Sequence, residues 1–167
     1  AYVDTEADRR ALLELETALA AGASPDRILM VGPGKSAAEL DRAVSLGIEA
    51  IVAESLDELV EIDANASAKG GVQRVAVRVN PDFQVGGARL AMSGRATQFG
   101  VDETDLARVL SALRGLSSLD LRGLHAYMGT RILSHETIAG NVRGIFALAR
   151  RAREAAGRPF AFVDVGG

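Results

Sequence analysis

The sequence has 167 residues, of which 48% are hydrophobic and 25% charged, with a formal charge of −3. This balance is that of a globular protein and excludes a disordered or fibrous chain. The absence of cysteine excludes disulfides, thiolate nucleophiles and Cys-ligated metal centres, and two histidines make a histidine-based metal cage an unfavoured reading. We expect a cytosolic protein without a membrane partner, because no apolar run approaches roughly 20 residues and no leader pattern opens the sequence.

Charge is distributed unevenly along the chain. Residues 1–84 carry 15 acidic and 8 basic side chains, net −7, whereas residues 85–167 carry 7 and 11, net +4. An acidic protein with only 4% aromatic residues is poorly suited to nucleic acid, so no nucleic-acid partner is expected. Lys35 and Lys69 are the only lysines, which limits any cofactor that binds covalently through an amine.

Short apolar runs alternate with segments of helical period, a pattern typical of parallel strands joined by crossover helices. Ser36 and Ser55 each precede a glutamate by three residues, a spacing that predicts a capped helix start. Residues 81–101 contain four glycines and no periodic pattern, and predict a long functional loop. In chain order we predict helix 9–21, strand 27–31, helix 37–46, strand 49–53, helix 56–67, strand 73–79, helix 103–114, strand 120–128, helix 135–156 and strand 160–165.

These five to six strand–helix units predict an α/β fold. A complete (β/α)8 barrel typically needs about 250 residues, so we expect an incomplete (β/α)8 TIM-type barrel. The competing architecture is an open doubly wound sheet, whose usual fingerprint is G-x-G-x-x-G after the first strand. Residues 32–36, GPGKS, resemble a phosphate loop but lack its spacing and follow an interior strand, which disfavours nucleotide binding.

Alternate residues of a strand share a face, which divides the strand 73–79 into two rows. Val75, Val77 and Val79 form the row expected to pack on helices, and Arg78 lies in the other row. An arginine on a buried strand needs an anion. Either a neighbouring carboxylate or a bound ligand could supply it.

Two later strands carry polar or flexible residues near their carboxyl ends. The strand 120–128 places Gly123, His125 and Tyr127 on one face, which suits a lumen that opens toward a ligand. The structural alternative is a hydrogen-bonded core histidine and a packed tyrosine. The last strand is followed by Gly166 and Gly167, whose backbone N–H groups could converge on an anion such as phosphate.

Six segments in order and spacing resemble one known family over nearly the whole chain. They are GASPDRI (22–28), VGPGK (31–35), VRVNPD (77–82), QFGV (98–101), GLHAYMGT (123–130) and VDVGG (163–167). Together they are similar to the barrel domain of fold-type III pyridoxal-phosphate decarboxylases, the diaminopimelate and ornithine decarboxylase group. The resemblance implies pyridoxal 5'-phosphate as cofactor and no metal site.

The resemblance also implies which residues surround the cofactor. Tyr127 stands where the family has a ring-stacking histidine, and a tyrosine can lie flat against a pyridine ring but does not titrate near neutral pH. Asp8 and Glu14 fall at the spacing of two family acids that flank the cofactor, or are solvated charges of a helix start. The full set of implied cofactor-binding residues is Arg78, His125, Tyr127, Thr130, Gly166, Gly167, Asp8 and Glu14.

The activity implied by the resemblance is α-decarboxylation of an amino acid. The motif at 125–131 looks closer to decarboxylases of biosynthetic side pathways, including ones that act on carrier-bound amino acids. The implied partners are an amino-acid or amino-acyl-carrier substrate and a second copy in a homodimer. Two alternatives stay open: a non-catalytic homologue that binds a protein partner or the cofactor, and an amino-acid racemase of the same fold.

One expected feature of the family is missing from the sequence. Its Schiff-base lysine lies on an earlier strand, but no lysine precedes Lys35, and Lys35 itself is expected to be a loop charge. We therefore assign no catalytic residue and expect little or no turnover from these 167 residues. We expect residues 1–167 to be a partial barrel domain, with the pyridinium-pairing acid and the C-terminal β-domain outside this chain.

Overall fold

The computed structural model describes residues 6–83, 100–129 and 132–166, with side chains from residue 12 onward. The helices are α1 (Glu6–Ala20), α2 (Ala37–Leu46), α3 (Leu56–Ala68), α4 (Glu103–Leu113) and α5 (His135–Ala156), with a 3-10 turn at Pro25–Arg27. The strands are β1 (Leu29–Met30), β2 (Ala50–Ala53), β3 (Gln73–Asn80), β4 (Val101–Asp102), β5 (Leu119–His125) and β6 (Phe162–Asp164).

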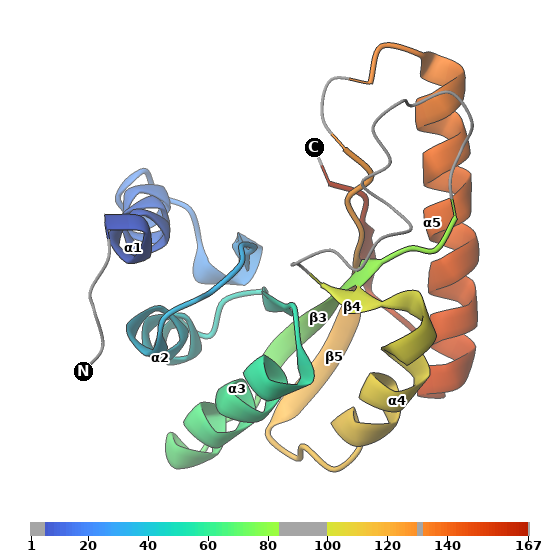
Figure 1. Cartoon of the computed structure of the whole chain (residues 1–167). Helices are drawn as coiled ribbons and strands as arrows, with labels where there is room; N and C mark the ends of the chain where they lie inside the picture. The colour runs from blue at the N-terminus through green and yellow to red at the C-terminus, as the bar shows by residue number, and fades with distance from the viewer. Residues whose placement is uncertain (1–5, 84–99, 130–131, 167) are drawn as a thin grey trace.

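The strands form a parallel sheet in the order β1-β2-β3-β5-β6, and the short β4 pairs with the end of β3. Figure 1 shows the helices arranged around one side of this sheet. Helices on one side alone are the arrangement of a barrel segment, whereas a doubly wound sheet carries helices on both faces. The predicted incomplete (β/α)8 barrel is confirmed.

The core lies between the helices and one row of strand side chains. Ile51 pairs in register with Val75, and Val77 pairs with Leu124; all four are buried in one cluster with residues of α2, α3, α4 and α5. The predicted alternation along β3 is therefore confirmed. The opposite row, which includes Arg78, faces the concave side of the sheet.

Local signals in the sequence set the helix starts and ends. Ser36 accepts a hydrogen bond from the Glu39 N–H, and Glu39 Oε2 accepts one from the Ser36 N–H at 2.7 Å, so the predicted capping box closes at α2. Ser55 caps α3 by accepting from the Glu58 N–H. The Glu58 carboxylate, however, turns to the backbone N–H of Glu54 instead of returning to Ser55.

The structure differs from the predicted strands in three places. The predicted strand 27–31 is mostly a 3-10 turn, and only Leu29–Met30 pairs in the sheet. The predicted strand 120–128 ends at His125 and contains an irregularity, because Val75 pairs with Leu121 while Ala76 pairs with Gly123. Of the predicted loop 81–101, residues 84–99 lie outside the described residues, and Val101 belongs to β4.

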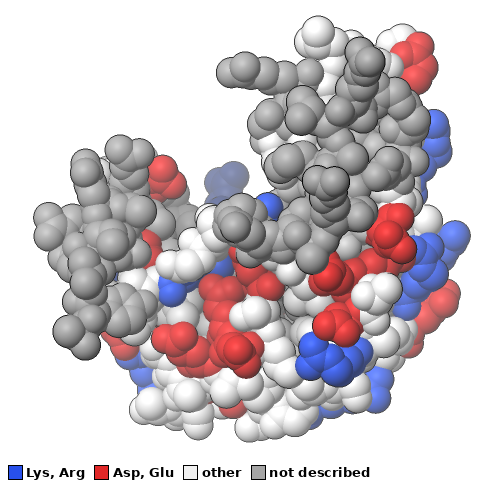
Figure 2. Space-filling view, viewed as in Figure 1, with Lys and Arg blue, Asp and Glu red and all other residues white. Residues whose placement is uncertain are grey.

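The charges are separated in space as they are in the sequence. On the face shown in Figure 2, acidic side chains gather toward the centre, and basic side chains lie along the edge where α5 runs. Helix α5 carries four arginines, Arg143, Arg150, Arg151 and Arg153. Among the described residues, no helix combines the length and hydropathy needed to cross a bilayer.

Gly123 provides a test of the β5–β6 pairing. A Cβ on Gly123 would lie 2.2 Å from the carbonyl oxygen of Phe162, which is its register partner on β6. We expect Gly123→Ala to lower the free energy of unfolding of the full-length protein by about 3 kcal/mol, the upper end of typical overpacking costs. Gly71→Ala is the matched control, because a Cβ there meets no atom within 4 Å. Equal denaturation midpoints for the two variants would contradict this pairing.

Candidate functional site

Four polar side chains lie on the concave face, where parallel strands end side by side. Arg78 at the end of β3 pairs in register with His125 of β5, and His125 pairs with Asp164 of β6. Glu54 directly follows β2 and reaches Arg78 from the other side. The carboxyl ends of barrel strands are where the ligand sites of this architecture are built, so this edge is the candidate site.

Arg78 is held by a carboxylate. Its Nη1 donates to Glu54 Oε1 at 2.6 Å, and the two side chains are 18% and 10% exposed. Of the two anions considered for this arginine, the neighbouring carboxylate is confirmed. Gly100, at φ +89°, lies close behind: a Cβ there would come within 3.2 Å of Arg78 Cγ.

His125 is a buried imidazole beside the carboxylate of Asp164. The residue is 5% exposed, and Nε2 lies 3.9 Å from Asp164 Oδ2. Burial lowers the pKa of His125; Asp164 opposes this shift and the positive charge of Arg78 adds to it. The imidazole is therefore neutral near pH 7. Its Nδ1 is buried and has no hydrogen-bond partner among the described residues, so a polar group of a ligand could satisfy it.

Tyr127 and Gly166 come together from two separate segments. A Cβ on Gly166 would lie 2.6 Å from Tyr127 Cδ2, so the aromatic ring lies directly against the glycine backbone. Gly166 has φ +73°, a region that favours glycine. Its N–H donates to Asp164 Oδ1 at 2.9 Å, which links the turn after β6 to the carboxylate beside His125.

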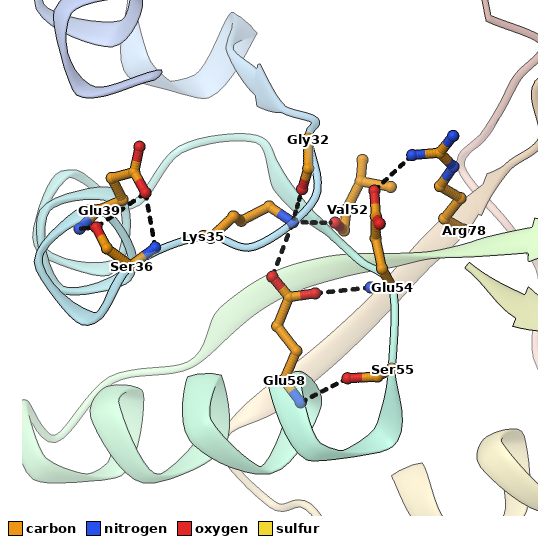
Figure 3. A network of polar contacts seen from close by, with 9 residues as sticks. All are labelled: Gly32, Lys35, Ser36, Glu39, Val52, Glu54, Ser55, Glu58 and Arg78. Atoms are coloured by element: carbon orange, nitrogen blue, oxygen red, sulfur yellow. Dashed lines mark hydrogen bonds and ion pairs between the residues drawn. The ribbon is translucent and has the colours of Figure 1, made fainter. Parts of the chain in front are cut away.

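Lys35 lies in the loop between β1 and α2, as expected, but its side chain is buried and not a solvated charge. Its side chain is 2% exposed. As Figure 3 shows, the ammonium donates to the carbonyl oxygens of Gly32 at 2.8 Å and Val52 at 2.7 Å, and to Glu58 Oε1 at 2.8 Å. All three N–H donors are thus used. The loop after β1 directs Lys35 beneath the end of β2, where it is not free to hold an anion or react as an amine.

Comparisons with known proteins agree with this geometry. A family model described as "Pyridoxal-dependent decarboxylase, pyridoxal binding domain" matches residues 5–167. The L-glutamyl-[BtrI acyl-carrier protein] decarboxylase of Niallia circulans is 38% identical over 154 residues, which are 92% of this chain and 36% of that protein.

The chain belongs to the pyridoxal-dependent decarboxylase family. A diaminopimelate decarboxylase of Helicobacter pylori is 30% identical over 168 residues, which cover 100% of this chain and 41% of that protein. The crystal structure of the Helicobacter pylori diaminopimelate decarboxylase complexed with L-lysine has a TM-score of 0.79 at 30% identity, covering 93% of this chain and 40% of that one. The chain thus spans about two fifths of the length of these relatives.

The family resemblance based on six segments is therefore confirmed, and so is pyridoxal phosphate as the cofactor of this kind of domain. Of the residues that the resemblance implies, the structure brings Arg78 and His125 into one row and places Tyr127 against Gly166.

For the other implied residues the structure gives less. Glu14 is exposed on α1. Asp8 lies on α1, but its side chain is not described, and Thr130 and Gly167 lie outside the described residues. Among the residues that the structure describes, no group of three or more His, Cys, Asp or Glu side chains could hold a metal ion.

Sequence reasoning missed Glu54, Glu58 and Asp164 as parts of this network. Strand alternation could have found two of them. Glu54 lies two residues after Val52 on the face that Arg78 shares, and Asp164 is the register partner of His125. The sequence predicts Glu58 only as a helix-start residue, and no sequence pattern shows that it contacts Lys35.

The depressed pKa of His125 predicts how stability depends on pH. In the unfolded chain the imidazole protonates at about pH 6.5. In the folded protein its pKa is lower, so it stays neutral at this pH. Protons therefore favour the unfolded state as the pH falls below this value. We expect the Tm advantage of wild type over His125→Gln to be larger at pH 7.5 than at pH 5.5, measured by thermal unfolding of the full-length protein.

His135→Gln is the control. His135 lies at the start of α5, and its side chain is 91% exposed. An advantage over His125→Gln that grows toward low pH would mean that the fold favours the imidazolium, and would contradict the assignment.

Proposed function

We propose that this chain is part of the pyridoxal-phosphate-binding barrel of an amino-acid decarboxylase. The observation that carries the proposal is the row formed by Arg78, His125 and Asp164 at the carboxyl edge of a half-barrel. The family match over residues 5–167 supports the same cofactor. The whole protein's activity is inferred from relatives of which this chain covers 36% to 41%.

The described residues suit the chemical groups of pyridoxal phosphate. The cofactor is a planar aromatic ring with polar substituents and a phosphate. Tyr127 offers a flat ring, Arg78 a cation, and His125 a buried nitrogen that lacks a partner. We propose that these three residues contact the ring and its substituents, with Asp8 and Glu14 flanking the cofactor as in the family.

The phosphate is assigned to Thr130, Gly166 and Gly167. The positive φ of Gly166 supports a tight turn of the kind that presents backbone N–H groups to an anion. Because the Gly166 N–H already donates to Asp164, we infer that neighbouring N–H groups and the Thr130 hydroxyl supply the direct phosphate contacts.

The chain's own residues have distinct tasks in the proposed mechanism. Bound pyridoxal phosphate supplies an electron sink for the electron pair left when carbon dioxide departs. A neutral His125 can accept or donate one hydrogen bond at Nδ1 without adding charge to the site. Glu54 fixes the Arg78 guanidinium through a short ion pair, and Tyr127 would cover one face of the bound cofactor and exclude water from it.

An amino-acyl group attached to a carrier is the first substrate to test. The Niallia circulans relative is named as a decarboxylase of an L-glutamyl group on an acyl-carrier protein, and it is 38% identical to this chain. The Helicobacter pylori diaminopimelate decarboxylase is 30% identical. We therefore propose an amino-acid or amino-acyl-carrier substrate, with a carrier-linked glutamyl group ahead of free diaminopimelate.

Three further features belong to the proposal. We infer that residues 1–167 are a partial barrel domain and that the Schiff-base lysine and β-domain are supplied by other parts of the full-length protein. The locked ammonium of Lys35 supports this, because it leaves no available lysine at the described site. We also propose a cytoplasmic homodimer.

The same observation on Lys35 favours one second candidate, a non-catalytic homologue that binds the cofactor or a protein partner. The racemase alternative differs in its product, because racemisation inverts the α-carbon without releasing gas.

The deciding experiment uses the full-length gene product with added pyridoxal phosphate. We expect a shifted visible absorption band that borohydride reduction abolishes, and carbon dioxide released from carrier-linked L-glutamate or from a free amino acid. Boiled protein with the same cofactor is the control for non-enzymatic release. Bound cofactor without a borohydride-sensitive band would favour the non-catalytic homologue, which lacks the Schiff-base lysine. Inversion without gas would favour the racemase, and no bound cofactor at all would overturn cofactor binding.

A further inference from the structure

The chain's two lysines form ion pairs in opposite environments. Lys35 and Glu58 pair with side chains that are 2% and 14% exposed, whereas Lys69 and Asp41 pair with side chains that are 34% and 57% exposed. A surface pair contributes little to stability. A buried pair loses the hydration of both charges. The attraction between the charges offsets this cost only when the geometry is good and further hydrogen bonds satisfy both groups.

The geometry of the buried pair is fixed on both sides. The Lys35 ammonium has two further acceptors, the carbonyl oxygens of Gly32 and Val52. The second carboxylate oxygen of Glu58, Oε2, accepts from the backbone N–H of Glu54 at 2.7 Å. Glu58 therefore joins the loop after β1 to the chain segment that leaves β2.

Glu54 passes this constraint on to the candidate cofactor site. Its backbone N–H is held by Glu58, and its carboxylate accepts from Arg78 Nη1 at 2.6 Å. Figure 3 shows the resulting line of contacts, which runs from Lys35 through Glu58 and Glu54 to Arg78. Three strands, β1, β2 and β3, are thereby connected at their carboxyl ends by charged groups.

We propose that Lys35 and Glu58 are positioning residues for the cofactor site. They fix the backbone at Glu54, and so hold the Glu54 carboxylate where it orients the Arg78 guanidinium. Neither residue needs to touch the cofactor. The inference rests on the proposed function, because Arg78 is taken as a cofactor contact, but the Lys35–Glu58–Glu54 connection can be measured without cofactor.

The double variant Lys35→Met/Glu58→Leu separates positioning from stability. It removes both charges and leaves no unpaired buried ion, so we expect a Tm close to that of wild type. The loss of the Glu58 acceptor should speed hydrogen exchange at the Glu54 amide about tenfold in the cofactor-free protein. We expect the Kd for pyridoxal phosphate to rise about tenfold, as for the loss of an orienting partner behind a binding group.

Three further variants complete the test in the full-length protein. Lys69→Met/Asp41→Leu, which removes the exposed pair, should leave exchange at Glu54 and the Kd unchanged. In an Arg78→Gln background, the Lys35→Met/Glu58→Leu change should add nothing to the Kd. Should the double variant fold poorly, Glu58→Gln keeps the side-chain shape and should still speed exchange at Glu54.

Two results would overturn the inference. One is a double variant with wild-type exchange and wild-type Kd, and the other is a Kd effect of full size in the Arg78→Gln background. A wild-type protein that binds no pyridoxal phosphate would instead contradict the proposed function, and exchange at Glu54 would then still report on the connection itself.

Discussion

The register between β3, β5 and β6 is the constraint on which the candidate site depends. Because Arg78, His125 and Asp164 are partners across neighbouring strands, their side chains share one face. A slip of one residue would turn a side chain to the opposite face of the sheet. The apolar partners prevent this: Val77 and Leu124 are buried among the helices by the same register. The register that buries the apolar row on one face of the sheet therefore brings the polar side chains together on the opposite face.

Several charged and polar side chains are partly or fully buried at the carboxyl edge of the half-barrel, and they fall into two groups. Lys35 and Glu58 are satisfied within the protein, as is the Glu54 carboxylate on Arg78. His125 is different, because burial keeps it neutral and leaves Nδ1 without a partner among the described residues. A buried polar atom without a partner is costly unless a ligand completes it. The paired charges therefore shape the site, whereas His125 Nδ1 is the atom that a bound ligand would contact.

Much of the fold could be predicted from local signals, and the site only in part. Helices 37–46 and 135–156 were predicted with the bounds that the structure has, since capping residues and glycines act within one turn. Strand alternation found Arg78 and His125. The contacts of Lys35 with Val52 and Glu58 join residues 17 and 23 positions away, and the approach of Tyr127 to Gly166 joins two strand ends. Such contacts arise from how strands are ordered in the sheet, which the sequence pattern of one segment does not contain.

The central claim is that the carboxyl edge of this half-barrel surrounds one pyridoxal phosphate. A crystal structure of the full-length protein grown with the cofactor tests it most directly. The account predicts the cofactor ring beside Tyr127 and a polar atom of the bound molecule within hydrogen-bond distance of His125 Nδ1. A cofactor bound on another face, with His125 still unpartnered and Tyr127 packed only on Gly166, would contradict it.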